Sequence, residues 1–168
     1  EDIEVTNAVF QNYNDWIVNY CSPNPNRLIG IGCVPLRDVD LAVSELHRAA
    51  KMGVKGVAIP CTAPIDRPYS DPYYEPFWEA ANEIGLPLTM HIFSGSDWPM
   101  ALPQHWDPIV AYTLSHAAIW NSVSNIVTSG VVERHPNLKF VVAEWETGWV
   151  AHTLQRWDHA FYRSRTAA

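Results

Sequence analysis

The sequence predicts an α/β fold in which parallel β-strands alternate with α-helices. Short, uninterrupted apolar segments recur along the chain, and such segments are typical of parallel strands buried on both faces. Between them lie segments whose apolar residues recur every three or four positions, the period of an amphipathic helix. The chain has 168 residues, 48% of them hydrophobic and 17% charged, which is the composition of a folded domain with a core.

The predicted helices and strands alternate from one end of the chain to the other, which favours a parallel sheet. They are a helix over residues 4–20, a strand over 28–34, a helix over 39–52, a strand over 55–61, a helix over 75–84, a strand over 86–92, a mostly helical stretch over 107–133, a strand over 138–144 and a helix over 148–163. After the third strand comes a loop of about a dozen residues, and loops longer than two to six residues are often functional.

Particular residues mark where the helices begin and end. The first helix is predicted by an apolar stripe of Val5, Val9, Tyr13, Trp16 and Tyr20. Asp38 is expected to cap the second helix, and Gly53 and Gly85 to end the second and third. The helical stretch over 107–133 should break near Ser122–Ser124 or at Gly130.

Charge and cysteine content exclude several classes of partner. The 11 basic and 18 acidic residues give a net charge of −7, and the basic ones are scattered, whereas a nucleic-acid-binding face is basic and clustered. We therefore expect neither nucleic acid nor a membrane surface as partner, and no segment reaches the roughly 18 apolar residues of a membrane span. The three cysteines contain no CxxC pair, which predicts a cytoplasmic protein without disulfides or a cysteine zinc site.

Two residues at predicted strand ends are the candidates for chemistry, because functional groups of parallel α/β folds gather at the carboxyl edge of the sheet. His91 follows an apolar strand and precedes the long loop, so it could bind metal or act as an acid or base, or only bond a neighbouring backbone group. Glu144 ends an apolar strand and could bind metal, act as a base, orient an imidazole or cap the last helix. Glu146 is expected to serve as that helix's N-terminal carboxylate.

The other histidines carry less weight. His47, His116, His152 and His159 fall on predicted helices without the i, i+4 spacing of a metal-binding pair, so surface or packing roles are favoured. His105 lies in the long loop with Trp98 and Trp106, and we expect these three residues to face the substrate. No GxGxxG, GxxxxGK[ST] or GxSxG motif supports dinucleotide, P-loop or α/β-hydrolase chemistry.

Residues 26–60, 69–92 and 129–149, in this order, resemble the amidohydrolase-related metal-dependent enzymes of the aminocarboxymuconate-semialdehyde decarboxylase-like group. The resemblance implies a (β/α)8 barrel with a divalent metal, commonly zinc, in which the four strands here correspond to the third through sixth. His91 then matches the metal-ligating histidine that ends the family's fifth strand. Glu144 stands where the sixth strand carries an acid/base histidine, in an E-x-x-x-G-W variant of that motif.

The resemblance also implies residues that this chain lacks. The family's His-x-His pair on the first strand and its last-strand aspartate have no counterpart in the 168 residues, and a complete barrel needs about 250. We therefore expect the central part of a barrel, spanning 1–168, that is inactive alone although its full-length parent is a decarboxylase or hydrolase of a small, carboxylated or cyclic molecule. The alternatives are a non-catalytic half-barrel for packing or self-assembly, which could form homo-oligomers, and a regulatory ligand-binding domain.

Overall fold

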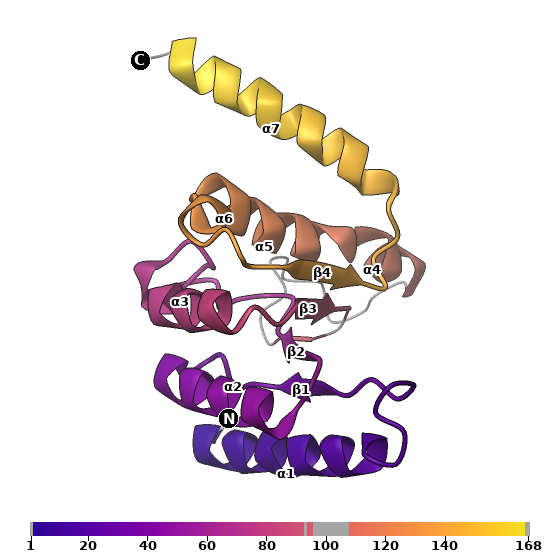
Figure 1. Cartoon of the computed structure of the whole chain (residues 1–168). Coiled ribbons are helices and arrows are strands. Elements are labelled where there is room, and N and C mark those ends of the chain that lie inside the picture. The colour runs from indigo at the N-terminus through magenta and orange to yellow at the C-terminus, as the bar shows by residue number, and fades with distance from the viewer. Residues whose placement is uncertain (1, 93, 96–107, 167–168) are drawn as a thin grey trace.

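Four parallel strands form one sheet in the order β1-β2-β3-β4, so each strand pairs with the next one along the chain (Figure 1). The computed structural model describes residues 2–92, 94–95 and 108–166. At least one helix separates each strand from the next. The predicted α/β class, with parallel strands alternating with helices, is confirmed.

The elements follow the predicted order. The strands are β1 (Ile31–Cys33), β2 (Gly56–Ile59), β3 (Leu88–His91) and β4 (Phe140–Ala143). The helices are α1 (Ile3–Cys21), α2 (Val39–Met52), the 3-10 helix η1 (Pro72–Tyr74), α3 (Glu75–Ile84), α4 (Pro108–Leu114), α5 (His116–Thr128), α6 (Val131–Arg134) and α7 (Gly148–Thr166). Within the described residues, no helix combines the length and the apolar character that a membrane span requires.

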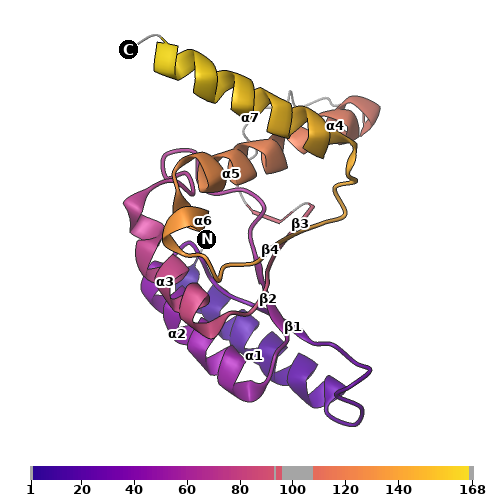
Figure 2. The same ribbon diagram turned by 45° about the horizontal axis from the view of Figure 1, so that its top comes forward.

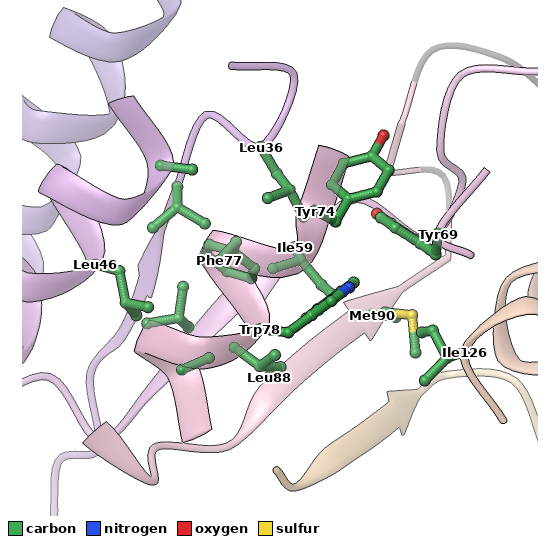
Figure 3. Close-up of a cluster of buried hydrophobic side chains, with 14 of the residues drawn as sticks. Leu36, Leu46, Ile59, Tyr69, Tyr74, Phe77, Trp78, Leu88, Met90 and Ile126 are labelled. Carbon is green, nitrogen blue, oxygen red and sulfur yellow. The ribbon is translucent and has the colours of Figure 1, made fainter. Parts of the chain in front are cut away.

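The core lies between the sheet and an outer layer of helices. Figure 2 shows α1, α2 and α3 along one side of the strands. The strand residues that face this layer are at most 2% exposed, namely Val57, Ile59, Leu88 and Met90. Figure 3 shows Ile59, Leu88 and Met90 around the ring of Trp78 from α3. On the opposite face of β3, Thr89 is half-buried and His91 is exposed, so the two faces of the sheet are unequally covered.

The strands are shorter than the apolar segments that predict them. Leu28 and Ile29 precede β1 and are exposed. The Leu28 N–H donates to the carbonyl of Asn24 in a turn, so it does not bond to a neighbouring strand. At the end of β4, Glu144 has a φ of 62° and so leaves the extended conformation. The predicted ranges 28–34 and 138–144 are therefore too long.

The helical stretch over 107–133 breaks at Gly130, as predicted, and also at Ser115. Gly130 has a φ of 78° and separates α5 from α6, and Ser115 lies between α4 and α5, with its hydroxyl bonded to the carbonyl of Tyr112 at 2.7 Å. Of the two predicted positions, the helix does not break near Ser122–Ser124. Both serines lie inside α5, where Ser122 donates to the Cys61 carbonyl and Ser124 accepts from the Trp157 indole.

Helix α1 forms as predicted, but the apolar stripe that predicts it faces away from the sheet. Val5, Val9, Trp16 and Tyr20 are 55–59% exposed and Tyr13 is 36% exposed. The opposite side of α1 lies on β1 and carries the fully buried Asn14. Its side chain accepts from the Cys33 N–H at 2.8 Å and donates to the Cys33 carbonyl at 2.9 Å. An amide side chain therefore occupies the free edge of β1 where a neighbouring strand would pair.

An ion-pair cluster joins the start of α3 to the end of α6. Glu75 accepts from Arg134 at 2.9 and 3.1 Å and lies 2.7 Å from Nε2 of His135. Hydrogen bonds from Arg134 dominate over partial burial and lower the pKa of Glu75 to about 2. Because this pKa lies below that of an unfolded glutamate, about 4.3, the cluster stabilises the fold above that pH and less as the pH falls towards 2.

Glu75→Gln is accordingly expected to lower the free energy of unfolding at pH 7 by about 1 kcal/mol, a modest value because solvent screens a carboxylate that is 39% exposed. The difference from the wild type should shrink between pH 4.5 and pH 3 in urea unfolding curves. Glu79→Gln, on the exposed side of α3, is the matched control. Equal pH dependence in the two variants would contradict the role assigned to the cluster.

Candidate functional site

The carboxyl ends of β3 and β4 bring together the two residues that the sequence singles out. His91 ends β3 and pairs in register with Ala143, the residue before Glu144, and Figure 1 shows the two strands side by side. Nε2 of His91 lies 2.8 Å from Oε2 of Glu144, and the side chains are 54% and 66% exposed. Sequence and topology therefore place an imidazole and a carboxylate in direct contact at the edge of the sheet.

The second ring nitrogen of His91, Nδ1, sets the orientation and the tautomer of the imidazole. Nδ1 lies 2.8 Å from the carbonyl oxygen of Ile92, and since a carbonyl only accepts, Nδ1 carries the donated proton. The alternative role that the sequence allows for His91, a hydrogen bond to a neighbouring backbone group, is therefore present. It leaves Nε2 directed at Glu144, so the backbone contact and a role in the site are compatible.

A buried tryptophan between two glutamates shapes the segment after β4. Trp145 is 1% exposed, whereas Glu144 and Glu146 have side chains that are 66% and 73% exposed. The two glutamates, with φ of 62° and 56°, are the non-glycine residues with positive φ in the described part of the chain. Such conformations cost energy and cluster at functional sites. The Trp145 anchor therefore turns both carboxylates outward at a local conformational cost.

His116 lies beside Trp145 and Glu146, and its ring contact with Trp145 agrees with the packing role that the sequence favours. It is the first residue of α5, its ring lies 6.1 Å from that of Trp145 in an edge-on arrangement, and its Nε2 lies 3.8 Å from Oε2 of Glu146. Glu146, expected to serve the start of α7, thus faces an imidazole. The helix that directly follows the long loop is α4, so the position of His116 at the start of α5 has no signal in the sequence spacing.

Other residues near the carboxyl edge of the sheet lie outside this contact. Trp98, His105 and Trp106 lie outside the residues that the structure describes. Asp38 caps α2 by accepting from the Leu41 N–H at 3.0 Å, as predicted. Burial raises the pKa of the Cys61 thiol, whose sulfur lies 2.7 Å from the Ser94 carbonyl.

Comparison with known protein families identifies the family to which this sheet and its helices belong. Residues 1–167 match the sequence profile of the amidohydrolase family. The chain belongs to the amidohydrolase family. A curated relative is 2-amino-3-carboxymuconate-6-semialdehyde decarboxylase of Dictyostelium discoideum, which is 28% identical over 156 residues, 90% of this chain and 41% of the relative. The chain thus spans less than half the length of that relative.

Solved structures agree with the amidohydrolase assignment. An amidohydrolase from Mycobacterium avium subsp. paratuberculosis is 27% identical with a TM-score of 0.79, over 98% of this chain and 45% of that one. The 5-carboxyvanillate decarboxylase of Sphingomonas paucimobilis is 25% identical with a TM-score of 0.74, over 84% and 42%. That of Novosphingobium aromaticivorans, solved with manganese, shares the fold at 24% identity and a TM-score of 0.77, over 98% and 48%. The four-stranded sheet and its helices therefore match about half of an amidohydrolase barrel structure.

The chemistry of the His91 pair fits a metal ligand. Histidines that bind metal usually donate their other ring N–H to a carbonyl or carboxylate, as Nδ1 of His91 does. In that tautomer Nε2 and the Glu144 carboxylate are both acceptors, so their 2.8 Å separation calls for a proton or a cation between them. A catalytic zinc takes three protein ligands, and among the described residues no group of three or more His, Cys, Asp or Glu could hold a metal. The described residues alone therefore do not form a catalytic zinc site.

Proposed function

We propose that this chain is the central part of an amidohydrolase barrel and that the complete enzyme is a metal-dependent decarboxylase or hydrolase of a small, carboxylated or cyclic molecule. The contact between His91 and Glu144 carries the proposal, because it lies at the carboxyl edge where barrel enzymes of this architecture have their active sites. Two relatives that are at least 25% identical to this chain are decarboxylases by name, which favours loss of carbon dioxide over hydrolysis.

Each candidate residue has a role in this proposal. Nε2 of His91 holds a divalent metal, and zinc is the ion that we expect. The bound metal would supply a polarised substrate carboxylate or an activated water. Glu144 either completes the ligand set or moves a proton beside it, and its exposure leaves it accessible to a substrate. Trp98, His105 and Trp106 are proposed to contact the substrate from the loop.

Metal titration tests the proposal directly. Because the described residues do not supply three protein ligands, calorimetry with Zn²⁺ and Mn²⁺ should show weak binding to the wild-type chain. The affinity should fall at least about tenfold in His91→Ala, since loss of outer-shell partners alone costs ten- to a hundredfold. His47→Ala removes an exposed histidine of α2 and should bind metal as the wild type does. Glu144→Gln separates the two roles of Glu144, because a ligand role predicts weaker binding and a proton-transfer role predicts unchanged binding. Equal affinity in His91→Ala and His47→Ala would contradict the assignment.

The exposed apolar surface favours self-assembly as a second candidate. The outward stripe of α1 and the 46% exposure of Val141 on the edge strand β4 are features that invite association. Sedimentation velocity on the same samples distinguishes the two candidates. A stable dimer without metal binding would favour a packing role for the chain over the enzyme role.

A further inference from the structure

Helix α1 presents an outward stripe of apolar side chains to solvent. The stripe consists of residues that recur every three or four positions and are 36–59% exposed, namely Val5, Val9, Tyr13, Trp16 and Tyr20. Figure 1 shows α1 at the opposite end of the molecule from α7, with no other labelled element beyond it. The stripe is therefore open to an incoming molecule, and it faces away from the sheet whose edge carries His91.

The three rings of the stripe already pack on one another. The ring centroids of Tyr13 and Trp16 lie 5.8 Å apart, and those of Trp16 and Tyr20 lie 5.5 Å apart with an interplanar angle of 28°. Neighbouring rings restrict each other's rotamers, so ordering them on binding costs less entropy. Aromatic side chains are also the groups that are enriched at protein interfaces and at their hot spots. The stripe thus has the composition and the order of an interface.

The stripe is large enough for a contact between two copies of this chain. An aromatic side chain buries about 150–250 Å² when it is fully covered, so three partly exposed rings and two valines offer about 500 Å² per copy. Exposed apolar patches of about 300–600 Å² often mark interaction sites. Two such stripes facing each other would bury about 1,000 Å², the lower limit of a specific interface. We therefore expect an affinity in the micromolar range.

Charge favours one direction of pairing for two α1 helices. The first turn carries Glu4 after the cap Asp2, and the helix contains no basic residue. A parallel pair would place these carboxylates against their own copies. In an antiparallel pair they lie at opposite ends, about 25 Å apart at 1.5 Å per residue, which exceeds the roughly 8–10 Å over which salt screens charges. Repulsion between the acidic turns therefore disfavours the parallel pair.

We propose that this stripe of α1 binds a second copy of the chain across a two-fold axis, with the two α1 helices antiparallel. Val5 then faces Tyr20 of the partner subunit, Val9 faces Trp16 of the partner subunit, and Tyr13 lies beside the axis. Small side chains thus meet large ones, as interdigitating layers require, and one stripe supplies both halves of a two-fold contact. This pairing deepens the self-assembly candidate proposed above and does not rest on the metal site.

Sedimentation velocity of the full chain measures the pairing. Between about 1 and 100 µM, the range expected for a small interface, the wild type should shift from monomer to dimer. Trp16→Ala removes the largest ring of the stripe and should weaken the dimer at least about tenfold, as loss of an interface hot spot does. Val141→Lys changes an exposed apolar residue on the edge strand β4 and should dimerise as the wild type does.

Cross-linking tests the direction of the helices. Chains carrying Val5→Cys and chains carrying Tyr20→Cys should form a disulfide-linked dimer when they are mixed and oxidised, because an antiparallel pair places these two positions opposite each other. Each variant alone should cross-link no more than the wild type, since its new cysteine lies about 22 Å from its own copy at 1.5 Å per residue. Cross-linking of each variant with itself would contradict the antiparallel arrangement.

Two further outcomes would overturn the proposal. A wild-type chain that stays monomeric at about 100 µM, well above the expected dissociation constant, would show that the stripe does not bind a second copy. A dimer that survives Trp16→Ala and dissociates in Val141→Lys would place the contact at the edge of β4. His91→Ala should dimerise like the wild type, so failure of the metal proposal and failure of this pairing are told apart.

Discussion

Trp78→Ala is expected to lower the free energy of unfolding by about 3–5 kcal/mol, the range for truncating a fully buried aromatic side chain. Trp78 is 0% exposed, and its ring centroid lies 5.4–6.1 Å from those of four surrounding rings, which belong to Tyr69, Tyr74, Phe77 and Phe140. Alanine would leave a cavity bounded by rigid rings that cannot collapse into it. Urea unfolding followed by far-UV circular dichroism measures the loss.

Trp78→Phe separates packing from the polar atom of the indole. The Trp78 Nε1 is buried and has no hydrogen-bond partner among the described residues, so phenylalanine removes an unsatisfied donor worth about 1–3 kcal/mol and offsets part of the lost volume. We expect a cost below about 1.5 kcal/mol. Trp16→Ala, at a 55% exposed position of α1, should change stability by no more than about 0.5 kcal/mol. Equal costs for the two Trp78 variants would contradict this account.

The order of elements is predictable from the sequence because apolar spacing is a local property. The ends of the strands are not predictable in this way, because they depend on which hydrogen-bond partner each backbone N–H and carbonyl finds in the folded chain. Leu28 and Ile29 are apolar enough to continue β1, yet the Asn24 carbonyl takes the N–H of Leu28. Similarly, at the break between α4 and α5 the Ser115 hydroxyl bonds the Tyr112 carbonyl in the preceding turn. Ser122 and Ser124, inside α5, bond to other elements instead.

The candidate site is predictable to the extent that it follows from topology. His91 and Glu144 end neighbouring parallel strands, so a correct strand order is sufficient to place them in contact. His116 reaches Trp145 and Glu146 only because α5 begins at His116 and because Trp145 is buried next to it, and neither fact is visible in spacing.

Asn14 shows how a polar residue can hold a sheet edge without any sequence signature. Its amide bonds the backbone of Cys33 at the edge of β1 and also donates to Glu45 at 2.6 Å. Glu45 is 1% exposed and is bonded to Arg48 at 2.8 Å. The hydrogen bonds to Glu45 and Asp15 raise the pKa of Arg48, so a permanent positive charge compensates the buried carboxylate. The edge of β1 and the α1–α2 contact thus share one buried polar network.

Asn14→Asp is therefore expected to destabilise the chain more than Asn14→Ala, although aspartate has the same shape as asparagine. Alanine leaves the Cys33 N–H and carbonyl without their partner and removes one donor to Glu45, which keeps its bonds to Arg48, at a cost of about 3 kcal/mol. Aspartate still accepts from the Cys33 N–H, but it places a second acceptor against the Cys33 carbonyl and the Glu45 carboxylate, where the amide now donates at 2.9 and 2.6 Å. Urea unfolding at pH 7 ranks the variants.

Two further variants make this ranking specific to the network. Asn12→Asp alters an exposed asparagine of the same helix that donates to the Ala8 carbonyl, and it should cost no more than about 0.5 kcal/mol. Adding Glu45→Gln to Asn14→Asp should recover part of the loss, because a glutamine amide can donate to the introduced carboxylate and its oxygen can still accept from Arg48. Wild-type stability in Asn14→Asp would show that the amide does not hold the edge of β1, which would then be free to pair with a strand from another polypeptide segment.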